Sequence, residues 1–217
     1  MKLIVTGGAG FIGCNAVARY LARGDQVVVL DNLSRKGADQ NLAWLESQHG
    51  HQPRQMAVAR VDIRDADAVA AVFRDHADAE VVLHLAGQVA VTTSVADPRT
   101  DFEINALGTF NVLEAARLLP RLRALLNAST NKVYGGMEDV GVIERNGRYA
   151  YGSLPGGVPE TQPLDFHSPY GCSKGAADQY TIDYARIYGL PTVTFRQSCI
   201  YGPRQMGVED QGWVAWF

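Results

Sequence analysis

The sequence predicts an α/β fold with a parallel sheet buried between helices, and two patterns indicate it. Short apolar segments recur along the chain at 2–5, 26–30, 56–61, 80–85, 122–129 and 191–197. Continuous apolar strands separated by stretches long enough for a helix are typical of a parallel sheet covered on both faces. Between them, the segments 11–24 and 100–119 carry apolar residues three and four positions apart, which predicts amphipathic helices.

Composition and charge narrow the class of protein. The 217 residues are 47% hydrophobic and 20% charged, which favours one domain, or one domain with part of another. Twenty basic side chains against 23 acidic ones give a net charge of -3, which favours neither nucleic acid nor a membrane surface as a partner. The apolar run after Met1 is too short for a signal peptide or a spanning helix.

The three cysteines, Cys14, Cys172 and Cys199, lie far apart and lack the spacing of metal ligands. An odd number argues against the disulfide framework of a secreted protein. We therefore expect no metal site and a cytoplasmic location.

The segment VTGGAGFIG, residues 5–13, predicts a dinucleotide site. Gly7, Gly10 and Gly13 stand between a predicted strand and a predicted helix. Glycines at these positions let the backbone turn tightly and approach a pyrophosphate, and the helix N-terminus offers it free N–H groups.

Asp31 at the end of the second strand strengthens this interpretation. It follows Gly13 by eighteen residues, where a carboxylate accepts hydrogen bonds from an adenosine ribose and repels a 2′-phosphate. The sequence therefore predicts NAD rather than NADP. Arg35 and Lys36 weaken the preference, because a nearby cation can accommodate that phosphate.

Later strand ends are expected to border the same site. Asp62 follows the third strand, where it can contact the nucleotide, cap a helix, or do both, whereas Asp65 is expected to be a cap. After the fourth strand in the sequence, the small residues Ala86 and Gly87 let the backbone pass close to a ligand. His84 is interpreted as a packed structural histidine in preference to a catalytic base.

Tyr170 and Lys174 predict an acid–base site because they are four residues apart at the start of a helix. Tyrosine titrates near pH 10, and a cation one turn away, together with a positively charged nicotinamide, is expected to lower that pKa by a few units. Tyr170 can then accept a proton from a hydroxyl group. The alternative is an ordinary solvated pair on a helix surface.

The motifs TGGAGFIG, DNLS, HLAG, NASTNKVYG and SPYGCSKGAADQY together resemble the extended short-chain dehydrogenase/reductase superfamily, in its sugar-nucleotide epimerase and dehydratase branch. Within that branch, the segments DNLSRKGADQNLAWL, STNKVYG and YGPRQMGVEDQGWVAWF resemble the CDP-paratose 2-epimerase (CDP-tyvelose epimerase) family most. The resemblance implies an NAD-dependent isomerase of O-antigen sugar biosynthesis that binds a nucleotide sugar, with a CDP-sugar favoured, and that is a homo-oligomer at full length.

It also implies a Rossmann-type doubly wound parallel sheet over residues 1–197. Residues 198–217 are expected to be the truncated beginning of a smaller C-terminal substrate domain. The catalytic residues implied are Thr130, Tyr170 and Lys174. Those implied for cofactor binding are Gly7, Gly10, Phe11, Ile12, Gly13, Asp31, Asn32, Ser34, Arg35, Asp62, Ile63, Leu85, Ala86, Gly87, Gln88, Asn105, Ser129, Tyr170, Lys174 and Gln197. Those implied for substrate binding are Gln88, Thr130, Asn131, Lys132, Tyr170, Gln197 and Ser198.

Two alternatives remain open at this stage. One is a 4-epimerase or a 4,6-dehydratase, although a dehydratase is expected to carry an Asp-Glu pair where this chain has Asn131 and Lys132. The other is a non-catalytic NAD-binding module. Residues 135–168 are expected to form a functional loop or lid, with disorder as the alternative. Trp213, Trp216 and Phe217 are expected to be an uncovered apolar cluster.

Overall fold

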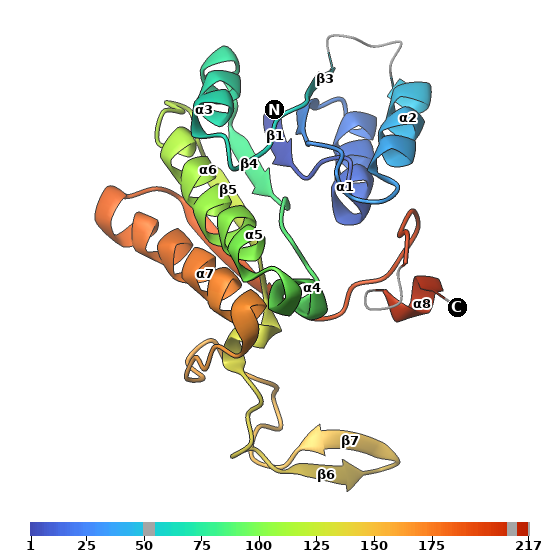
Figure 1. The fold of residues 1–217 in the computed structure, drawn as a ribbon, viewed down its shortest axis with the longest axis vertical. Helices are drawn as coiled ribbons and strands as arrows, with labels where there is room; N and C mark the ends of the chain where they lie inside the picture. Colours follow the sequence, from blue (N-terminus) through green and yellow to red (C-terminus); the bar gives the residue numbers. More distant parts are fainter. Residues whose placement is uncertain (50–54, 208–211, 217) are drawn as a thin grey trace.

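The computed structural model describes residues 1–49, 55–207 and 212–216, and its centre is a six-stranded parallel sheet (Figure 1). The strands run in the order β3-β2-β1-β4-β5-β8. They are β1 (Lys2–Thr6), β2 (Gln26–Leu30), β3 (Met56–Ala59), β4 (Val81–His84), β5 (Ala124–Thr130) and β8 (Thr192–Gln197). Each of the six predicted apolar segments contains or overlaps one of these strands. The order reverses between β1 and β4, which is where doubly wound sheets bind their ligands.

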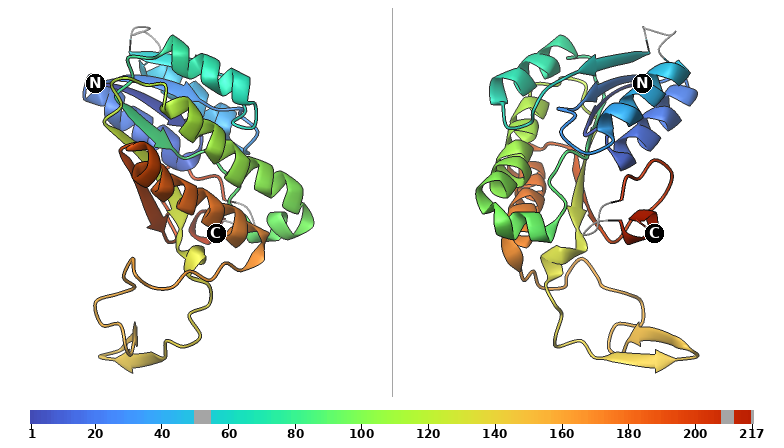
Figure 2. Two further views of the ribbon diagram at one scale, coloured as in Figure 1. Left: turned by 90° about the vertical axis from the view of Figure 1, so that its left-hand side faces the viewer. Right: turned by 45° about the vertical axis from the view of Figure 1, so that its right-hand side comes forward.

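Helices cover both faces of the sheet, because alternate strand residues point to opposite sides. Leu3 and Val5 pack with the helices α1 and α2, whereas Ile4 and Val28 pack with α3, α6 and α7. These two groups of helices lie on opposite sides of the strands (Figure 2). The helices are α1 (Phe11–Ala22), α2 (Ala38–His49), α3 (Ala66–Asp75), α6 (Gly108–Ala116) and α7 (Ser168–Tyr188).

The helix predicted over 100–119 is interrupted in the structure. It begins as α5 (Pro98–Phe102), passes through a π-helical turn, η1 (Glu103–Leu107), and continues as α6. The short helix α4 (Val91–Ala96) precedes it. Such turns are often found at functional sites, and this one contains Asn105.

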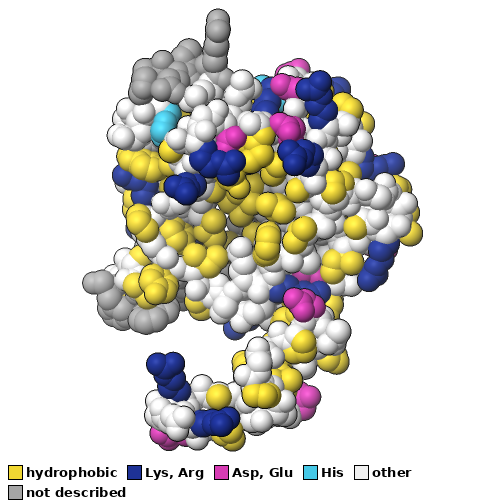
Figure 3. All heavy atoms as spheres, turned by 180° about the vertical axis from the view of Figure 1, so that it is seen from behind, with side chains coloured by type: hydrophobic (Ala, Val, Ile, Leu, Met, Phe, Trp, Pro, Cys, Tyr) yellow, Lys and Arg dark blue, Asp and Glu magenta, His cyan; other side chains and the backbone are white. Residues whose placement is uncertain are grey.

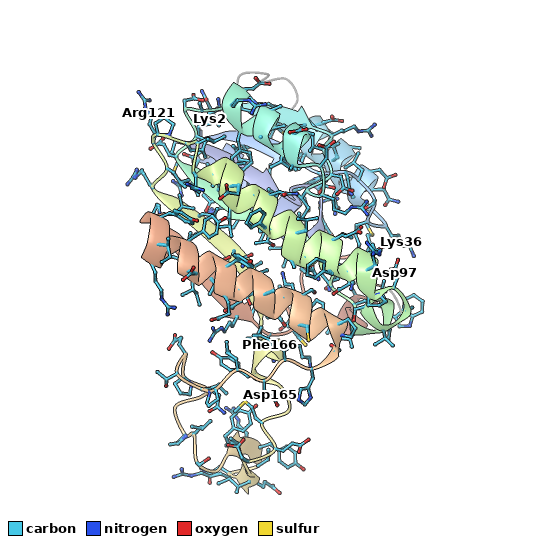
Figure 4. The ribbon with its side chains drawn as sticks, turned by 60° about the vertical axis from the view of Figure 1, so that its left-hand side comes forward. Lys2, Lys36, Asp97, Arg121, Asp165 and Phe166 are labelled. Atoms are coloured by element: carbon cyan, nitrogen blue, oxygen red, sulfur yellow. The ribbon has the colours of Figure 1, made fainter. Side chains whose placement is uncertain are left out.

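Residues 135–168 form an arm and not a lid. The arm carries an antiparallel hairpin of β6 (Val142–Arg145) and β7 (Arg148–Tyr151), which projects away from the body (Figures 1 and 2). All eight strand residues are exposed, and basic side chains stand at the far end of the arm (Figure 3). At its base, Asp165 and Phe166 lie beside the start of α7 (Figure 4).

Two short helices complete the structure. The 3-10 turn η2 (Asn131–Tyr134) follows β5, and α8 (Trp213–Trp216) stands near the C-terminal end. Trp216 is 51% exposed, as expected. The side chain of Trp213 and the whole of Phe217 lie outside the described residues, so the rest of the predicted apolar cluster stays a prediction.

Candidate active site

A cavity of about 440 Å³ opens at the carboxyl edge of the sheet, where the strand order reverses. No residue of the arm lines it, which contradicts the lid interpretation. All but two of the predicted site residues do line it. They are Gly7, Gly10, Phe11, Ile12, Gly13, Asp31, Asn32, Ser34, Arg35, Asp62, Ile63, Leu85, Ala86, Gly87, Ser129, Thr130, Asn131, Lys132, Tyr170, Lys174, Gln197 and Ser198.

The glycine turn has the backbone that a pyrophosphate site needs. Gly7 has a φ of 66°, and a Cβ there would lie 2.7 Å from the backbone nitrogen of Ala86. A Cβ at Gly13 would collide with the carbonyl oxygen of Gly7. Gly10 is the N-cap of α1 and has no side chain to occupy the N–H groups of the first turn. The turn therefore presents free N–H donors to the cavity.

Asp31 is fixed at the end of β2 by two backbone hydrogen bonds. One carboxylate oxygen accepts from the N–H of Ala9 at 2.9 Å, and the other from the N–H of Leu33 at 2.8 Å. The side chain thus ties the glycine turn to the β2 end while it borders the cavity. Each oxygen keeps a second lone pair for a ligand hydroxyl.

Asp62 holds the neighbouring strand end together. Its carboxylate accepts two hydrogen bonds from the Arg64 guanidinium, at 3.0 and 2.8 Å, and one from the Asn32 amide at 2.8 Å. The hydrogen bond from Arg64 lowers the pKa of Asp62 to about 2. The helix cap is provided by Asp65, which accepts from the N–H of Ala68, so the cap predicted for Asp65 is confirmed.

Tyr170, Lys174 and Thr130 meet at the cavity wall. Tyr170 and Lys174 are each 8% exposed, and Thr130 is 7% exposed. The Lys174 ammonium donates a hydrogen bond of 2.6 Å to the carbonyl oxygen of Ala128 on β5. Burial lowers the pKa of Lys174 to about 8. This buried cluster excludes the solvated-pair alternative.

The expected lowering of the tyrosine pKa counted on a bound nicotinamide, and in the chain without a ligand the pKa of Tyr170 is raised. Burial raises the pKa of Tyr170, because the phenolate loses water, and the hydrogen bond with Thr130 only partly offsets this. Asp101 also raises it. The lowering that base catalysis requires must come from a bound positive charge.

Gln88 and Asn105 are the two predicted site residues that do not line the cavity. The Gln88 amide donates to the carboxylate of Asp101 and to the carbonyl of Ala90. Asn105 is 1% exposed; its amide oxygen accepts from the N–H of Gln88, and its amide nitrogen donates to the Asp101 carboxylate and the Ser173 hydroxyl. Both amides face inward because these buried groups need partners.

Three further residues near the site, His84, Ser129 and Tyr134, form hydrogen bonds with other side chains of the chain. His84 is 2% exposed and lies between the hydroxyls of Thr6 and Thr109, and burial lowers its pKa to about 3. Ser129 lines the cavity but donates its hydroxyl hydrogen bond to Asp178. Tyr134 is buried and accepts a hydrogen bond from Arg196.

The segment 199–207 also borders the cavity, which the sequence did not indicate. Its residues pack on α1 and α2: the Asn15 amide donates to the carbonyl of Pro203 at 2.9 Å, and the Arg204 guanidinium stacks 3.8 Å from the centroid of the Trp44 ring. Arg204 and Met206 line the cavity. No local pattern predicts this path, because the contacts join segments far apart in the sequence.

Comparison with known proteins identifies the family of this chain. The family model described as GDP-mannose 4,6 dehydratase matches residues 4–210. The chain belongs to this family. The family lies within the extended short-chain dehydrogenase/reductase superfamily.

The relatives that this chain resembles include sugar-nucleotide epimerases and dehydratases. CDP-paratose 2-epimerase of Salmonella typhi is 49% identical over 217 residues, which are 100% of this chain and 62% of the relative. The UDP-glucose 4-epimerase of Thermus thermophilus, solved with NAD, is 37% identical with a TM-score of 0.77, and the match covers 100% of this chain and 61% of that one. The dTDP-glucose 4,6-dehydratase DesIV of Streptomyces venezuelae, solved with NAD, is 33% identical with a TM-score of 0.74, covering 94% and 58%.

This chain thus spans about three fifths of the length of these relatives. Among the described residues, no helix has both the length and the apolar character to cross a membrane.

Proposed function

We propose that this chain is the NAD-binding part of an epimerase that acts on a nucleotide-diphosphate sugar. The activity that we favour is that of a CDP-paratose 2-epimerase. One observation carries the proposal: Thr130, Tyr170 and Lys174 converge on the cavity that the glycine turn and Asp31 also border. The identity of 49% to the Salmonella enzyme supports the choice of substrate.

The residues present fit an NAD molecule. The glycine turn leaves N–H donors free for the pyrophosphate, and the fixed carboxylate of Asp31 has lone pairs for the ribose hydroxyls. Lys174 would hydrogen-bond the nicotinamide ribose. Bound NAD⁺ supplies the acceptor for a hydride and a positive charge beside Tyr170.

The three catalytic residues divide the work on the sugar. Thr130 would hold the reacting C2 oxygen, and Tyr170 would accept the proton of that hydroxyl while the hydride leaves the same carbon. After the 2-keto sugar rotates in the site, the hydride would return to the opposite face of C2 and Tyr170 would return the proton to the oxygen. No net oxidation results, so the proton held by Tyr170 is used within the same turnover.

Substrate contacts are assigned to the residues at the β5 and β8 ends. Thr130, Asn131 and Lys132 follow one strand, and Gln197 and Ser198 follow the other. The boundary between the cofactor domain at 1–197 and a substrate domain from 198 remains our proposal. A 4-epimerase on another nucleotide sugar is the second candidate, since relatives with that name are 35% identical.

The location and assembly of the protein are also proposed. We place the protein in the cytoplasm, and we propose that it is a homo-oligomer. The exposed apolar side chains of α6 and α7 support association, among them Phe110, Tyr180, Ile187 and Tyr188. These two helices lie side by side (Figure 4). Light scattering on the purified protein would give its mass, and a monomer at micromolar concentration would contradict the oligomer.

The test of the function begins with the purified full-length protein. Mass spectrometry of the nucleotide released on denaturation should identify NAD. A screen of CDP-, UDP- and dTDP-sugars should then show epimerisation at C2 of CDP-paratose. Turnover of only a UDP-sugar would favour the 4-epimerase. Stoichiometric NAD without any turnover would favour a non-catalytic NAD-binding module.

A further inference from the structure

A buried carboxylate lies beneath the proposed catalytic pair, and the mechanism above does not use it. Asp101 on α5 is 1% exposed. Its carboxylate accepts hydrogen bonds from the Ser173 hydroxyl at 2.5 Å, the Gln88 amide at 2.7 Å and the Asn105 amide at 3.1 Å. These donors come from α7, from the loop after β4 and from the π-helical turn. Asp101 therefore joins three separate elements that surround the site.

The charge of Asp101 has no direct counter-ion within the described part of the chain. Ten ion pairs are formed among the described residues, and Asp101 takes part in none of them. Asp178, one turn after Lys174 on α7, is different: it pairs with Arg196 at 2.9 Å and accepts from Ser129 at 2.7 Å. A buried carboxylate without a counter-ion is costly. Its presence next to the helix that carries the proposed catalytic lysine therefore indicates a functional role.

We propose that Asp101 is a positioning residue: the hydrogen bond from Ser173 fixes the part of α7 between Tyr170 and Lys174, and the buried carboxylate supplies a fixed negative charge that acts on the Lys174 ammonium. This rests on the proposed function for its consequences in turnover. Its effect on Lys174 is expected without any substrate, because the hydrogen bonds that hold Asp101 exist in the chain alone.

Among the described residues, the other charged and titratable groups that act on Lys174 or lie close to it are His84, Tyr170 and Asp178. His84 from β4 is neutral, since burial lowers its pKa to about 3. Tyr170 is neutral at pH 7, because burial raises its pKa. Asp178 also raises the pKa of Lys174, but its carboxylate is already paired with Arg196 from β8. Asp101 raises the pKa values of both Lys174 and Tyr170, so its charge favours the protonated form of each.

Removal of the charge should therefore move two titrations in the same direction. In Asp101→Asn, Lys174 would lose its proton at lower pH, and Tyr170 would lose its proton at lower pH as well. The acid limb of the turnover profile follows the tyrosine, and the alkaline limb follows the lysine. Both limbs are expected to shift toward acid. A merely structural defect would lower the rate and leave the limbs in place.

The sequence allows a direct measurement on Lys174. Residues 1–217 contain four lysines, Lys2, Lys36, Lys132 and Lys174, and NMR of the full-length protein labelled at the lysine Cε carbons gives a titration curve for each lysine signal. Lys174→Met identifies the signal. We expect the NAD-free full-length protein to show Lys174 titrating near pH 8, and Asp101→Asn to lower that midpoint by about half a unit or more.

A matched control is Asp183→Asn, which removes an exposed carboxylate from the same helix α7. It should leave the Lys174 midpoint and both limbs unchanged. An unchanged midpoint in a folded Asp101→Asn variant overturns the proposal. A shifted midpoint in a protein that turns over no sugar nucleotide would support Asp101 and refute the proposed function, so the two failures are distinguishable.

If Asp101→Asn fails to fold, Ser173→Ala gives a second test. This variant removes the hydrogen bonds of the Ser173 hydroxyl with Asp101, Asn105 and the Tyr170 carbonyl and keeps the Asp101 charge, so Lys174 should still titrate near its original midpoint while turnover falls. A midpoint lowered as far as expected for Asp101→Asn would show that the hydrogen bonds, and not the charge, act on Lys174, which would overturn the electrostatic part.

Discussion

The ammonium nitrogen of Lys174 lies 2.6 Å from the carbonyl oxygen of Ala128, so that the helix α7 is joined to the strand β5. An ammonium has three N–H donors. The bond to Ala128 uses one and fixes the direction of the others. Lys174 is thus oriented before any ligand enters, which reduces the cost of reaching the geometry of the reaction.

Tyr170→Phe tests the proposed base. The change removes the hydroxyl and keeps the ring that fills the cavity wall. Turnover of the full-length enzyme should fall by at least about 10²-fold, as for the loss of a general base, while NAD still binds. Tyr180→Phe on the same helix is the control, since Tyr180 is 49% exposed and lies outside the cavity lining. Activity of Tyr170→Phe within a few-fold of wild type would reassign the base.

Asp31→Asn tests the cofactor preference. The wild type should bind NAD more tightly than NADP, because the Asp31 carboxylate repels a 2′-phosphate. The amide removes that repulsion and should reduce the difference between the affinities for NAD and NADP, as measured by calorimetry with both nucleotides. It also weakens the bonds to Ala9 and Leu33, and should lower the melting temperature by a few degrees (about 1 kcal/mol). Asp39→Asn, exposed on α2, should change neither. Equal binding of NADP by the wild type would refute the preference.

Gly13→Ala tests the glycine turn. The new Cβ would meet the Gly7 carbonyl oxygen, so the turn must open. Overpacking of this kind costs about 1–3 kcal/mol, and we expect a lower melting temperature and a NAD affinity reduced about 10-fold or more. Gly141→Ala is the matched control, because a Cβ there meets nothing within 4 Å. Unchanged NAD binding by Gly13→Ala would show that the pyrophosphate lies elsewhere.

His84 gives a prediction for acid stability. Its folded-state pKa of about 3 lies below the ordinary value of 6.5, so the unfolded chain takes up the proton first as the pH falls. The stability contributed by neutral His84 is complete above pH 6.5 and decreases toward pH 3, by about 1.4 kcal/mol per pH unit. Between pH 7.5 and pH 5, the melting temperature of His84→Gln should decrease by less than that of the wild type. An equal loss in both proteins would contradict this, and a loss of turnover beyond a few-fold would revive His84 as a catalytic residue.

The sequence predicted those features that depend on short-range patterns. The six strands have continuous apolar segments, and the glycine turn and Asp31 stand at fixed positions behind two of them, so their meeting at one sheet edge follows from parallel topology. Asp65 as a helix cap and His84 as a packed histidine were also predictable, because each depends on its immediate neighbours along a strand or helix.

Other features depend on contacts that only the folded chain creates. Gln88 and Asn105 were expected to face the cofactor, and they instead satisfy a buried carboxylate that comes from α5. The pKa of Tyr170 was expected to be lowered beside a bound nicotinamide, and in the ligand-free chain its burial by distant elements raises it. The path of residues 199–207 across α1 and α2 depends on Arg204 and Trp44, which no sequence spacing connects.

The arm of residues 135–168 has a consequence for proteolysis. A hairpin of two strands has little stability of its own, and here all eight strand residues are exposed, with Arg145 and Arg148 on either side of the turn. Local opening of the arm needs no disruption of the sheet or its helices. Trypsin should therefore cut at the hairpin under native conditions and leave two fragments that remain associated, because β5 and α7 on either side of the arm stay packed in the body.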